Sequence, residues 1–321
     1  PDDAGGAAPL SADAHAMTPL FSVIIPVFNR ADILERAIRS VLEQSCQDFE
    51  IVVIDDGSKD HPEAVVAQIG DPRVRIVHQE NRGGSAARNH GIDEARGRFV
   101  ALLDSDDRFL PHHLENMRRL LENSTNTVGY ARMIVDRGNG VTLLKPPRAI
   151  RPGEHMATYL LCDRGFIPTI KIALPTEIAR KVRYGEKWRP AEDTDFAIRL
   201  FLAGCEFKMI DEPGAVWDDT YNPNRTSAGR KSAGLLPWIE QLKPLIPARA
   251  YHGGRGWAIA KGVAVKNPRT ALRYYLTAVL HGCYKPRLAM LIFLQIFLPD
   301  ALYRRIADSA IPFLPRRGAP S

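Results

Sequence analysis

Residues 21–110 alternate between short apolar runs and amphipathic segments. Residues 21–28 form an apolar run rich in β-branched side chains, and residues 31–43 place apolar side chains at helical spacing. The same alternation predicts strands that end in polar turns at 50–58 and 98–107, a strand at 74–79, and helices at 62–69 and 84–96. Because strands that alternate with helices are typical of α/β proteins, we predict a parallel, doubly wound sheet with right-handed crossovers.

The pattern after residue 110 is less regular, and no internal repeat is present. It predicts a helix at 112–122, strands around a Gly-Asn-Gly turn within 128–150, a helix at 192–203 that stops at Gly204, and proline-punctuated helical pieces that include 266–282 and 285–308. We therefore divide the chain into a disordered tail (1–19), a sheet domain (20–230) and a basic helical C-terminal region (231–321).

Composition and charge narrow the class of protein. The 321 residues are 45% hydrophobic and 25% charged, which is typical of a globular protein and excludes disordered or collagen-like chains. Four widely spaced cysteines without a C-x-x-C pair suggest neither a zinc ribbon nor a disulfide framework, and favour a reducing, cytoplasmic setting. The net charge of +6 is uneven, because residues 230–321 alone carry 15 Lys and Arg against three acids.

The basic C-terminal region favours an anionic partner surface. Its apolar run over 288–298 is too short to cross a bilayer, and nothing in the chain resembles a secretory signal. Two interpretations stay open: residues 285–308 lie on an anionic membrane surface, at the inner face of the cytoplasmic membrane, or this helix packs against the sheet domain. Nucleic acid is not an expected partner, since the region holds no recognisable reader motif.

Four polar clusters follow the first four predicted strands. They are Asn29-Arg30, Asp55–Ser58, Asn81–Gly84 and Asp104–Asp107. The carboxyl ends of parallel strands meet at one edge of a sheet, where such proteins bind their ligands. The four clusters therefore predict a single site at that edge.

The strongest chemical signal is the acidic run Asp104-Ser105-Asp106-Asp107. In an extended segment, Asp104 and Asp106 point to the same side, and two close carboxylates repel unless a cation neutralises them. Hard oxygen ligands select Mg²⁺ or Mn²⁺, which stabilises a departing diphosphate. The alternative is a solvated acidic turn before the next helix.

Glu192-Asp193 form a second acidic centre, at the start of the predicted helix 192–203. One of these carboxylates is a candidate general base that takes a proton from an acceptor hydroxyl. The alternative is that both only complement the dipole of the helix N-terminus.

Other polar residues fit a nucleotide site or an ordinary turn. Asp56 is suited to accept hydrogen bonds from a ribose or a base, or else closes a turn with Gly57. The segment 81–85 precedes a helix N-terminus, whose N–H groups suit phosphate oxygens, while Arg88 could equally form a surface ion pair. The first strand is not followed by a G-x-G-x-x-G or P-loop motif, which disfavours dinucleotide oxidoreductases and P-loop NTPases.

Five motifs in one order identify a resemblance that covers about residues 20–230. The segments FSVIIPVFNR, FEIVVIDDGSKD, ENRGGSAARNHGI, GRFVALLDSDDRFLP and AEDTDFAIRLFLAG together resemble the family 2 glycosyltransferases. The resemblance implies a GT-A nucleotide-sugar-binding sheet flanked by helices, here with a C-terminal helical extension. It also implies inverting transfer of a hexose from a nucleoside diphosphate donor, most often UDP-linked, assisted by Mg²⁺ or Mn²⁺.

The resemblance also assigns roles to individual residues. Asp193 becomes the catalytic base, with Glu192 beside it to orient the acceptor or the base, and Asp106 and Asp104 become the metal ligands. The nucleotide-binding residues are Pro26, Val27, Asn29, Asp56, Gly84, Arg88, Asp104 and Ser105. The expected acceptor is a hydroxyl of a saccharide, in particular a lipid-linked saccharide of bacterial polysaccharide biosynthesis.

One position departs from the family pattern. Many members carry a histidine after the base helix about where this chain has Asn222, so either Asp219, Arg225 or Ser227 substitutes for it or the diphosphate is held differently. Trp188 and Trp217 are candidates for the acceptor site or for the core.

Two alternative functions remain. A sugar nucleotidyltransferase would need a basic, glycine-rich loop after the first strand, which PVFNR does not resemble. A catalytically inactive, membrane-attached glycan-binding scaffold would not need the intact Asp104, Asp106 and Asp193.

Overall fold

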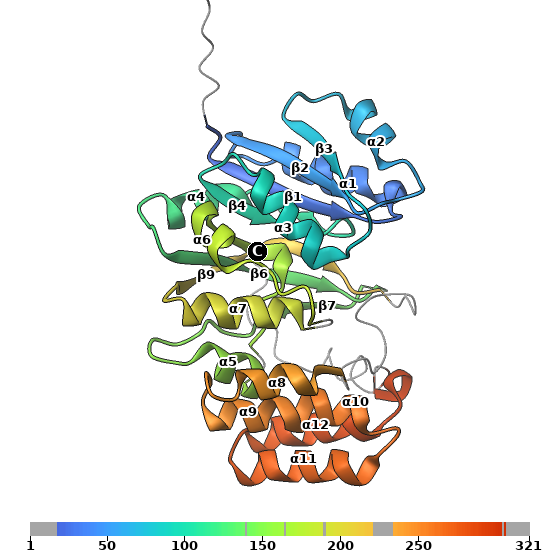
Figure 1. Ribbon diagram of the computed structural model, residues 1–321, viewed down its shortest axis with the longest axis vertical. Coiled ribbons are helices and arrows are strands. Elements are labelled where there is room, and N and C mark those ends of the chain that lie inside the picture. The colour runs from blue at the N-terminus through green and yellow to red at the C-terminus, as the bar shows by residue number, and fades with distance from the viewer. Residues whose placement is uncertain are drawn as a thin grey trace, which may run out of the picture.

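The computed structural model describes residues 18–138, 140–163, 165–188, 191–220, 234–303 and 305. Within these residues, nine strands form one mixed sheet in the order β3-β2-β1-β4-β8-β6-β9-β5, with β7 paired to β6 (Figure 1). The strands are β1 (Phe21–Val27), β2 (Phe49–Asp55), β3 (Val74–His78), β4 (Phe99–Leu102), β5 (Arg108–Phe109), β6 (Thr127–Asp136), β7 (Thr142–Lys145), β8 (Ile172–Pro175) and β9 (Glu206–Asp218).

Helices cover both faces of this sheet. They are α1 (Ala31–Leu42), α2 (Pro62–Ile69), α3 (Gly84–Glu94), α4 (His113–Leu121), α5 (Met156–Cys162), α6 (Thr176–Val182), α7 (Glu192–Leu202), α8 (Leu236–Leu242), α9 (Ala248–Gly254), α10 (Ala260–Val263), α11 (Pro268–Leu280) and α12 (Pro286–Phe297), with a 3₁₀ turn η1 (Thr169–Lys171) and a π turn η3 (Arg255–Ile259). The two-residue period of β1 points Ile24 to the face covered by α3, α5, α6 and α7, and Val23 and Ile25 to the face covered by α1, α2 and α4. The predicted α/β sheet with helices on both faces is confirmed.

The prediction of a parallel sheet holds for β1 to β4 and for the β6–β9 pair, but not for the whole sheet. Strands β3, β2, β1 and β4 are parallel, whereas β8 runs antiparallel to β4 and β6, and β5 and β7 also pair in antiparallel fashion. The β6–β7 connection is a short hairpin in which Gly138 and Gly140 take left-handed conformations, with φ of +81° and +75°. So short a link between neighbouring strands reverses the chain direction, and the sheet becomes mixed.

Two predicted elements end earlier than their sequence patterns. The strand expected over 98–107 stops at Leu102, because the Asp107 N–H donates to the Asp104 carbonyl (3.1 Å) and closes a turn. The helix expected over 285–308 breaks after Phe297, since Leu298 is extended ahead of Pro299, and residues 300–303 are helical again. Helix α11 matches its predicted range closely and is capped by Asn267, whose side chain accepts from the Thr270 N–H (3.1 Å).

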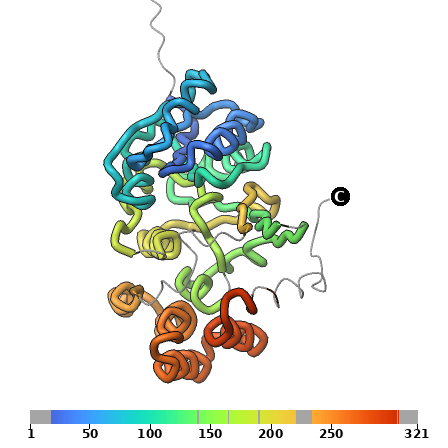
Figure 2. The backbone as a smooth tube through the Cα atoms, turned by 90° about the vertical axis from the view of Figure 1, so that its right-hand side faces the viewer, coloured from blue at the N-terminus to red at the C-terminus, as the bar shows by residue number. Residues whose placement is uncertain are grey.

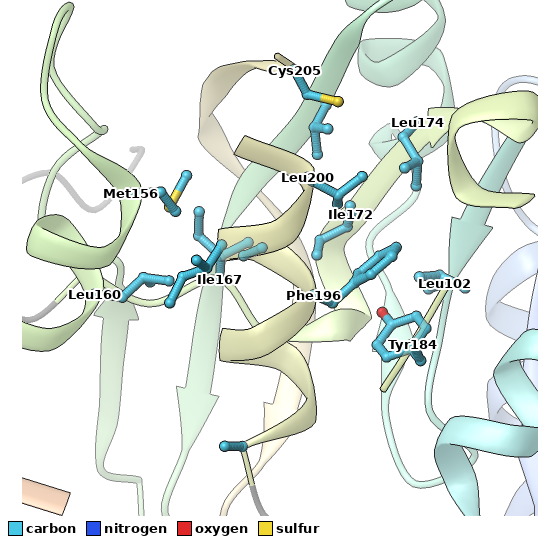
Figure 3. Close-up of a cluster of buried hydrophobic side chains, with 14 of the residues drawn as sticks. Leu102, Met156, Leu160, Ile167, Ile172, Leu174, Tyr184, Phe196, Leu200 and Cys205 are labelled. Atoms are coloured by element: carbon cyan, nitrogen blue, oxygen red, sulfur yellow. The ribbon is translucent and has the colours of Figure 1, made fainter. Parts of the chain in front are cut away.

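Helix α7 is held against the sheet by its apolar face (Figure 3). Phe196 and Leu200 are fully buried and belong to the same apolar cluster as Ile172 and Leu174 of β8. The Tyr184 ring stacks on Phe196, with 4.0 Å between ring centroids. This packing anchors the helix and fixes where its first turn, with Glu192 and Asp193, lies relative to the sheet.

The C-terminal helices gather at one end of the molecule, beyond α5 and α7 (Figures 1 and 2). Helices α8 and α9 join the core of the sheet domain, where Trp238 Nε1 donates to the Asp195 carboxylate (2.9 Å). Helices α10, α11 and α12 form a separate apolar cluster that also includes Cys162 of α5. Within the described residues, none of the helices is both long and apolar enough to cross a membrane.

In the described part of the chain, helix α12 packs on the other C-terminal helices and not on the sheet, which corrects one of the two interpretations that the sequence left open. Leu288, Ile292 and Ile296 are buried in the cluster of α10–α12, whereas Met290 (60% exposed) and Phe293 (41%) face outward. The buried side chains are spaced three or four residues apart and form one stripe of the helix. Packing and an outward apolar face therefore coexist on α12.

Candidate active site

The carboxyl ends of the parallel strands border a cavity of about 550 Å³. That volume lies within the range of small-molecule sites in proteins. Ten of the eleven predicted site residues line it: Pro26, Val27, Asp56, Gly84, Arg88, Asp104, Ser105, Asp106, Glu192 and Asp193. Asn29 is not among the lining residues, because its side chain accepts from the Lys59 N–H (2.9 Å) and its own N–H donates to Ser58 Oγ (3.0 Å). Asn29 joins two loops beside the cavity.

Asp56 organises the loop between β3 and α3. Its carboxylate is 3% exposed and accepts from the Arg82 N–H (2.8 Å), the Gly83 N–H (2.7 Å) and the Gln79 side chain (2.7 Å). Gly83 has a φ of +90°, which suits glycine and lets the chain turn directly into α3. The sequence predicted a ligand contact at Asp56, and the structure adds a structural role for the same carboxylate.

Arg88 of α3 brings a positive charge to the centre of the cavity. Its guanidinium donates to Asp104 Oδ1 (2.6 Å) and lies 5.5 Å from the centre of the Tyr184 ring. Burial disfavours the charge, but the negative charges of Asp104 and Asp193 more than offset this effect and raise the pKa of Arg88. Arg88 is thus a fixed cation between the two acidic centres rather than a surface ion pair.

Three carboxylates gather where β4 ends. Single ligand oxygens of Asp104, Asp106 and Asp107 lie within 4.8 Å of one another. Asp106 pairs with Arg30 (2.8 Å), and Asp107, which is 2% exposed, accepts from the Asp218 N–H of β9 (3.1 Å). The two ion pairs with Arg30 and Arg88 restrain the carboxylates in positions where their charges would otherwise repel.

This acidic cluster fits a hard divalent cation. Carboxylate oxygens are the ligands that Mg²⁺ and Mn²⁺ prefer, and the close spacing of Asp104, Asp106 and Asp107 allows more than one of them to bind the same ion. Such an ion, when bound, supplies charge that stabilises a departing diphosphate. The sequence predicted Asp104 and Asp106 for this role, and the fold adds Asp107 to the cluster.

Asp193 lies in the first turn of α7, close enough to Arg88 and Asp104 for the first to attract it and the second to repel it. Thr169 Oγ1 donates a short hydrogen bond to Asp193 Oδ1, and Thr169 is in turn within 3.2 Å of the Tyr184 hydroxyl. Burial raises the pKa of Asp193 to about 6, because the attraction of Arg88 is weaker than this effect and Asp104 adds repulsion. A carboxylate with such a pKa is matched to proton transfer near neutral pH.

The neighbouring acids of α7 have different surroundings. Glu192 lines the cavity, and its Oε2 is buried with no hydrogen-bond partner in the described part of the chain. Asp195 instead accepts from Trp238 Nε1 and from Arg199 Nε (2.7 Å). The helix dipole alone therefore does not explain Glu192 and Asp193, whereas Asp195 connects α7 to its neighbours.

Several cavity residues escaped the sequence analysis. Arg30 stood in a predicted cluster, but its pairing with Asp106 had no sequence signal. Phe166 and Thr169 belong to an apolar segment without a recognisable motif, so only the fold brings Thr169 to Asp193. Trp217 lines the cavity, while Trp188 packs at the margin of the core. Asn222, Arg225 and Ser227 lie outside the described residues, and Asp219 pairs with Arg137 (3.6 Å).

The chain is similar in sequence to known glycosyltransferases. Over 239 residues, the chain is 27% identical to the amylovoran biosynthesis glycosyltransferase AmsB of Erwinia amylovora, a match that covers 71% of this chain and 79% of AmsB. It is 31% identical over 235 residues to an uncharacterized glycosyltransferase of Rickettsia bellii, of which the match spans 34%.

The fold itself has a close counterpart among solved structures. Residues 1–349 of TarS from S. aureus, in complex with UDP-GlcNAc, superpose with a TM-score of 0.64 over 92% of this chain and 93% of that one, at 18% sequence identity. At that identity the likeness concerns the fold, which is GT-A. Residues 22–172 match the sequence model of glycosyl transferase family 2. The chain thus carries the sequence pattern of a family 2 glycosyl transferase over residues 22–172.

Proposed function

We propose that the chain is an inverting glycosyltransferase that moves a hexose from a UDP-linked donor to a hydroxyl of a lipid-linked saccharide in bacterial polysaccharide biosynthesis. The observation that carries this proposal is one cavity lined by the acidic cluster, by Asp193 and by Arg88, whose positive charge is attracted by Asp104 and by Asp193. The similarity to AmsB, a glycosyltransferase of amylovoran biosynthesis, and to TarS, solved in complex with UDP-GlcNAc, supports the choice of pathway and donor.

In this mechanism, Asp193 takes the proton from the acceptor hydroxyl as the hydroxyl oxygen attacks the anomeric carbon of the donor. The bond between that carbon and the diphosphate breaks, and its electron pair leaves on the diphosphate. Arg30 and Arg88 hold Asp106 and Asp104 in place, and Glu192 orients the acceptor through its unpaired oxygen. Because attack and departure occur on opposite sides of the carbon, one displacement inverts its configuration.

Titration of the purified chain with UDP, GDP, CDP and TDP, with Mn²⁺ and with a chelator, tests the donor site. We expect metal-dependent binding with a preference for UDP. A preference for another nucleoside diphosphate would contradict only the choice of UDP as the donor nucleotide. Binding of none of the four to a folded sample would contradict the transferase and favour the glycan-binding scaffold.

The stereochemistry of the product tests the single displacement. We expect proton NMR of the first product formed to show the anomeric configuration opposite to that of the donor sugar. A product with the donor's configuration would contradict Asp193 as a general base and would favour two successive displacements.

The pH profile of transfer reports the ionisation of Asp193. Burial raises the pKa of this carboxyl to about 6, and it acts as a base only when deprotonated. We therefore expect kcat/KM to be constant above about pH 7 and to fall about tenfold per pH unit well below pH 6. Initial rates at low donor concentration measure this acidic side of the pH profile. Circular dichroism at each pH verifies that the chain stays folded. A midpoint near pH 4 would contradict the perturbed base.

We also propose that the outward face of α11 and α12 contacts an anionic membrane surface, which would bring the site to a lipid-linked acceptor. Apolar side chains recur along one face of α11 at Leu272 (40% exposed), Leu276 (47%) and Leu280 (86%). Arg269 and Arg273 lie on the same face, at the helical spacing that places them beside these leucines. Apolar and cationic side chains on one helix face are the combination that anionic lipid surfaces bind.

Vesicle flotation measures this contact. The chain is expected to float with phosphatidylglycerol vesicles at low salt, less with phosphatidylcholine vesicles, and less as ionic strength rises. Replacement of Leu276 and Leu280 by Asp is expected to lower the bound fraction at least tenfold, because two apolar contacts are lost and negative charge is added. Leu245→Asp, at an exposed leucine outside α11 and α12, is the matched control. Equal flotation of the Leu276 and Leu280 double variant and of Leu245→Asp would contradict the proposal that this face of α11 contacts the membrane.

A further inference from the structure

We propose that Phe166 and Trp217 form a saccharide subsite, against which a pyranose ring of the acceptor stacks during transfer. This inference rests on the proposed glycosyl transfer and names the part of the cavity that receives the acceptor. The two residues come from separate parts of the fold, Phe166 from the segment before η1 and Trp217 from the end of β9. Their ring centroids lie 5.5 Å apart, with 31° between the ring planes.

Both rings line the cavity and are half-buried. Each packs in part against the core cluster that includes Leu103 and Met133, and each also contributes to the cavity wall. Two adjoining aromatic rings that line a polar cavity form an apolar patch among carboxylates and arginines. Such a patch has no role in holding a diphosphate, whose oxygens require charged or N–H partners.

The backbone ties each ring to one of the two acidic centres. Phe166 lies three residues before Thr169, whose hydroxyl donates to Asp193. Trp217 directly precedes Asp218, whose N–H donates to Asp107 Oδ1 (3.1 Å). Each ring is therefore connected along the chain to one acidic centre, and both rings line the same cavity as Asp193. An acceptor hydroxyl that gives its proton to Asp193 must lie within hydrogen-bond reach of it inside this cavity, where we infer that its sugar ring contacts the pair.

Two lysines hold the pair in place. Lys145 of β7 is not a lining residue of the cavity, and its Nζ lies 4.9 Å from the Phe166 ring centre and 5.7 Å from that of Trp217. Lys171 is fully buried and donates from Nζ to the Phe166 carbonyl (2.9 Å). The Lys145 amine near both rings and the buried hydrogen bond from Lys171 to the Phe166 backbone restrict the pair, which reduces the entropy that a ligand must remove on binding.

The chemistry of the pair fits a sugar ring better than the donor's base. A pyranose presents C–H groups on its faces and hydroxyls at its rim, and the negative face of an aromatic ring attracts C–H groups. The hydroxyls around such a ring would meet Glu192, whose Oε2 is buried without a partner in the described residues. Asp56 and the loop that it organises lie at the other strands, β2 and β3, where the nucleotide is proposed to bind.

The test separates acceptor binding from donor binding. Saturation-transfer NMR is recorded with methyl glycosides of glucose, galactose and mannose, added to the chain with UDP and Mn²⁺. The expected result is binding of at least one glycoside, with the strongest saturation on C–H protons of one ring face. Trp217→Leu is expected to lower the affinity for that glycoside about tenfold, and Phe166→Leu to lower it less. Trp217→Phe is expected to retain most of the affinity. All three variants should keep the wild-type affinity for UDP with Mn²⁺.

Trp188→Leu is the matched control, because Trp188 is also half-buried but does not line the cavity. Equal glycoside binding by Trp217→Leu and wild type, or no glycoside binding when UDP binds normally, would overturn the subsite and leave the proposed function intact. Failure of wild type to bind any nucleoside diphosphate would instead overturn the proposed function. Retained UDP binding shows that a weakened variant is folded, so a loss restricted to glycosides reports the subsite itself.

Discussion

Asp193→Asn is expected to reduce the rate of sugar transfer by about 10²- to 10⁴-fold, while UDP affinity in the presence of Mn²⁺ stays close to that of wild type. The magnitude is that of a lost general base. The substituted amide would keep the size of the side chain and an oxygen that accepts from Thr169, but it cannot take a proton. Single-turnover rates with a labelled donor, together with calorimetric titration of UDP, separate the chemical step from binding.

The same substitution that lowers the transfer rate is expected to preserve or raise the stability of the fold. The folded-state pKa of Asp193 lies above the usual value, so ionisation of this group costs stability that builds up as the pH rises from about 4 to about 6 and persists above pH 6. Asn carries no such cost, and the thermal midpoint of Asp193→Asn at pH 7.5 should equal or exceed that of wild type. Loss of activity with a raised Tm excludes unfolding as its cause.

Glu177→Gln is the matched control, since Glu177 is also a first-turn acid of a helix but is exposed and does not line the cavity. We expect it to leave transfer unchanged. Strongly reduced UDP binding by Asp193→Asn would contradict the assignment of Asp193 as a base and would place it in the donor site instead.

Asp106→Ala is expected to weaken UDP binding in the presence of Mn²⁺ by roughly 10- to 100-fold or more. Replacing a residue that only supports a metal ligand already lowers metal affinity by about 10- to 100-fold, and Asp106 is proposed as a ligand itself. The substitution removes one of three clustered carboxylates and also the partner of Arg30, which would remain beside Asp104 and Asp107. Titrations of UDP with Mn²⁺ and with a chelator measure how much of the binding depends on the metal.

In the chelator, Asp106→Ala should bind UDP about as well as wild type, because the lost affinity belongs to the ion and not to the nucleotide. Asp211→Ala removes an acid of β9 that is 80% exposed, and serves as a control for the general change in charge. If Asp106→Ala kept the Mn²⁺ dependence of wild type, Asp106 would not be a metal ligand.

Arg88 connects these two predictions. It donates to Asp104, and it is attracted by both Asp104 and Asp193. A change in charge at the acidic cluster therefore alters the pKa of the base through the same guanidinium and through the direct repulsion between Asp104 and Asp193. The acid limb of the pH profile in Asp106→Ala, measured at saturating metal, reports how strongly the two centres depend on each other.

Sequence patterns predicted the local elements and the edge of the sheet that carries the site. The apolar runs and helical spacings of residues 21–110 found β1 to β4 and α1 to α3, since these elements are defined by short-range periodicity. The parallel direction of β1 to β4 then placed four polar clusters at one edge, because a crossover helix returns each strand in the same orientation. Turns were less predictable, as the early end of β4 at Leu102 demonstrates.

The remaining features depend on contacts between residues that are distant in sequence. The sequence by itself determined which residue types stand after each strand and at the start of α7, because those positions follow from local patterning. Only the tertiary structure decided that Arg30 meets Asp106, that Thr169 meets Asp193 and that Phe166 meets Trp217. The raised pKa of Asp193 has the same origin, since burial and the field of Arg88 and Asp104 exist only once helix and sheet have packed together.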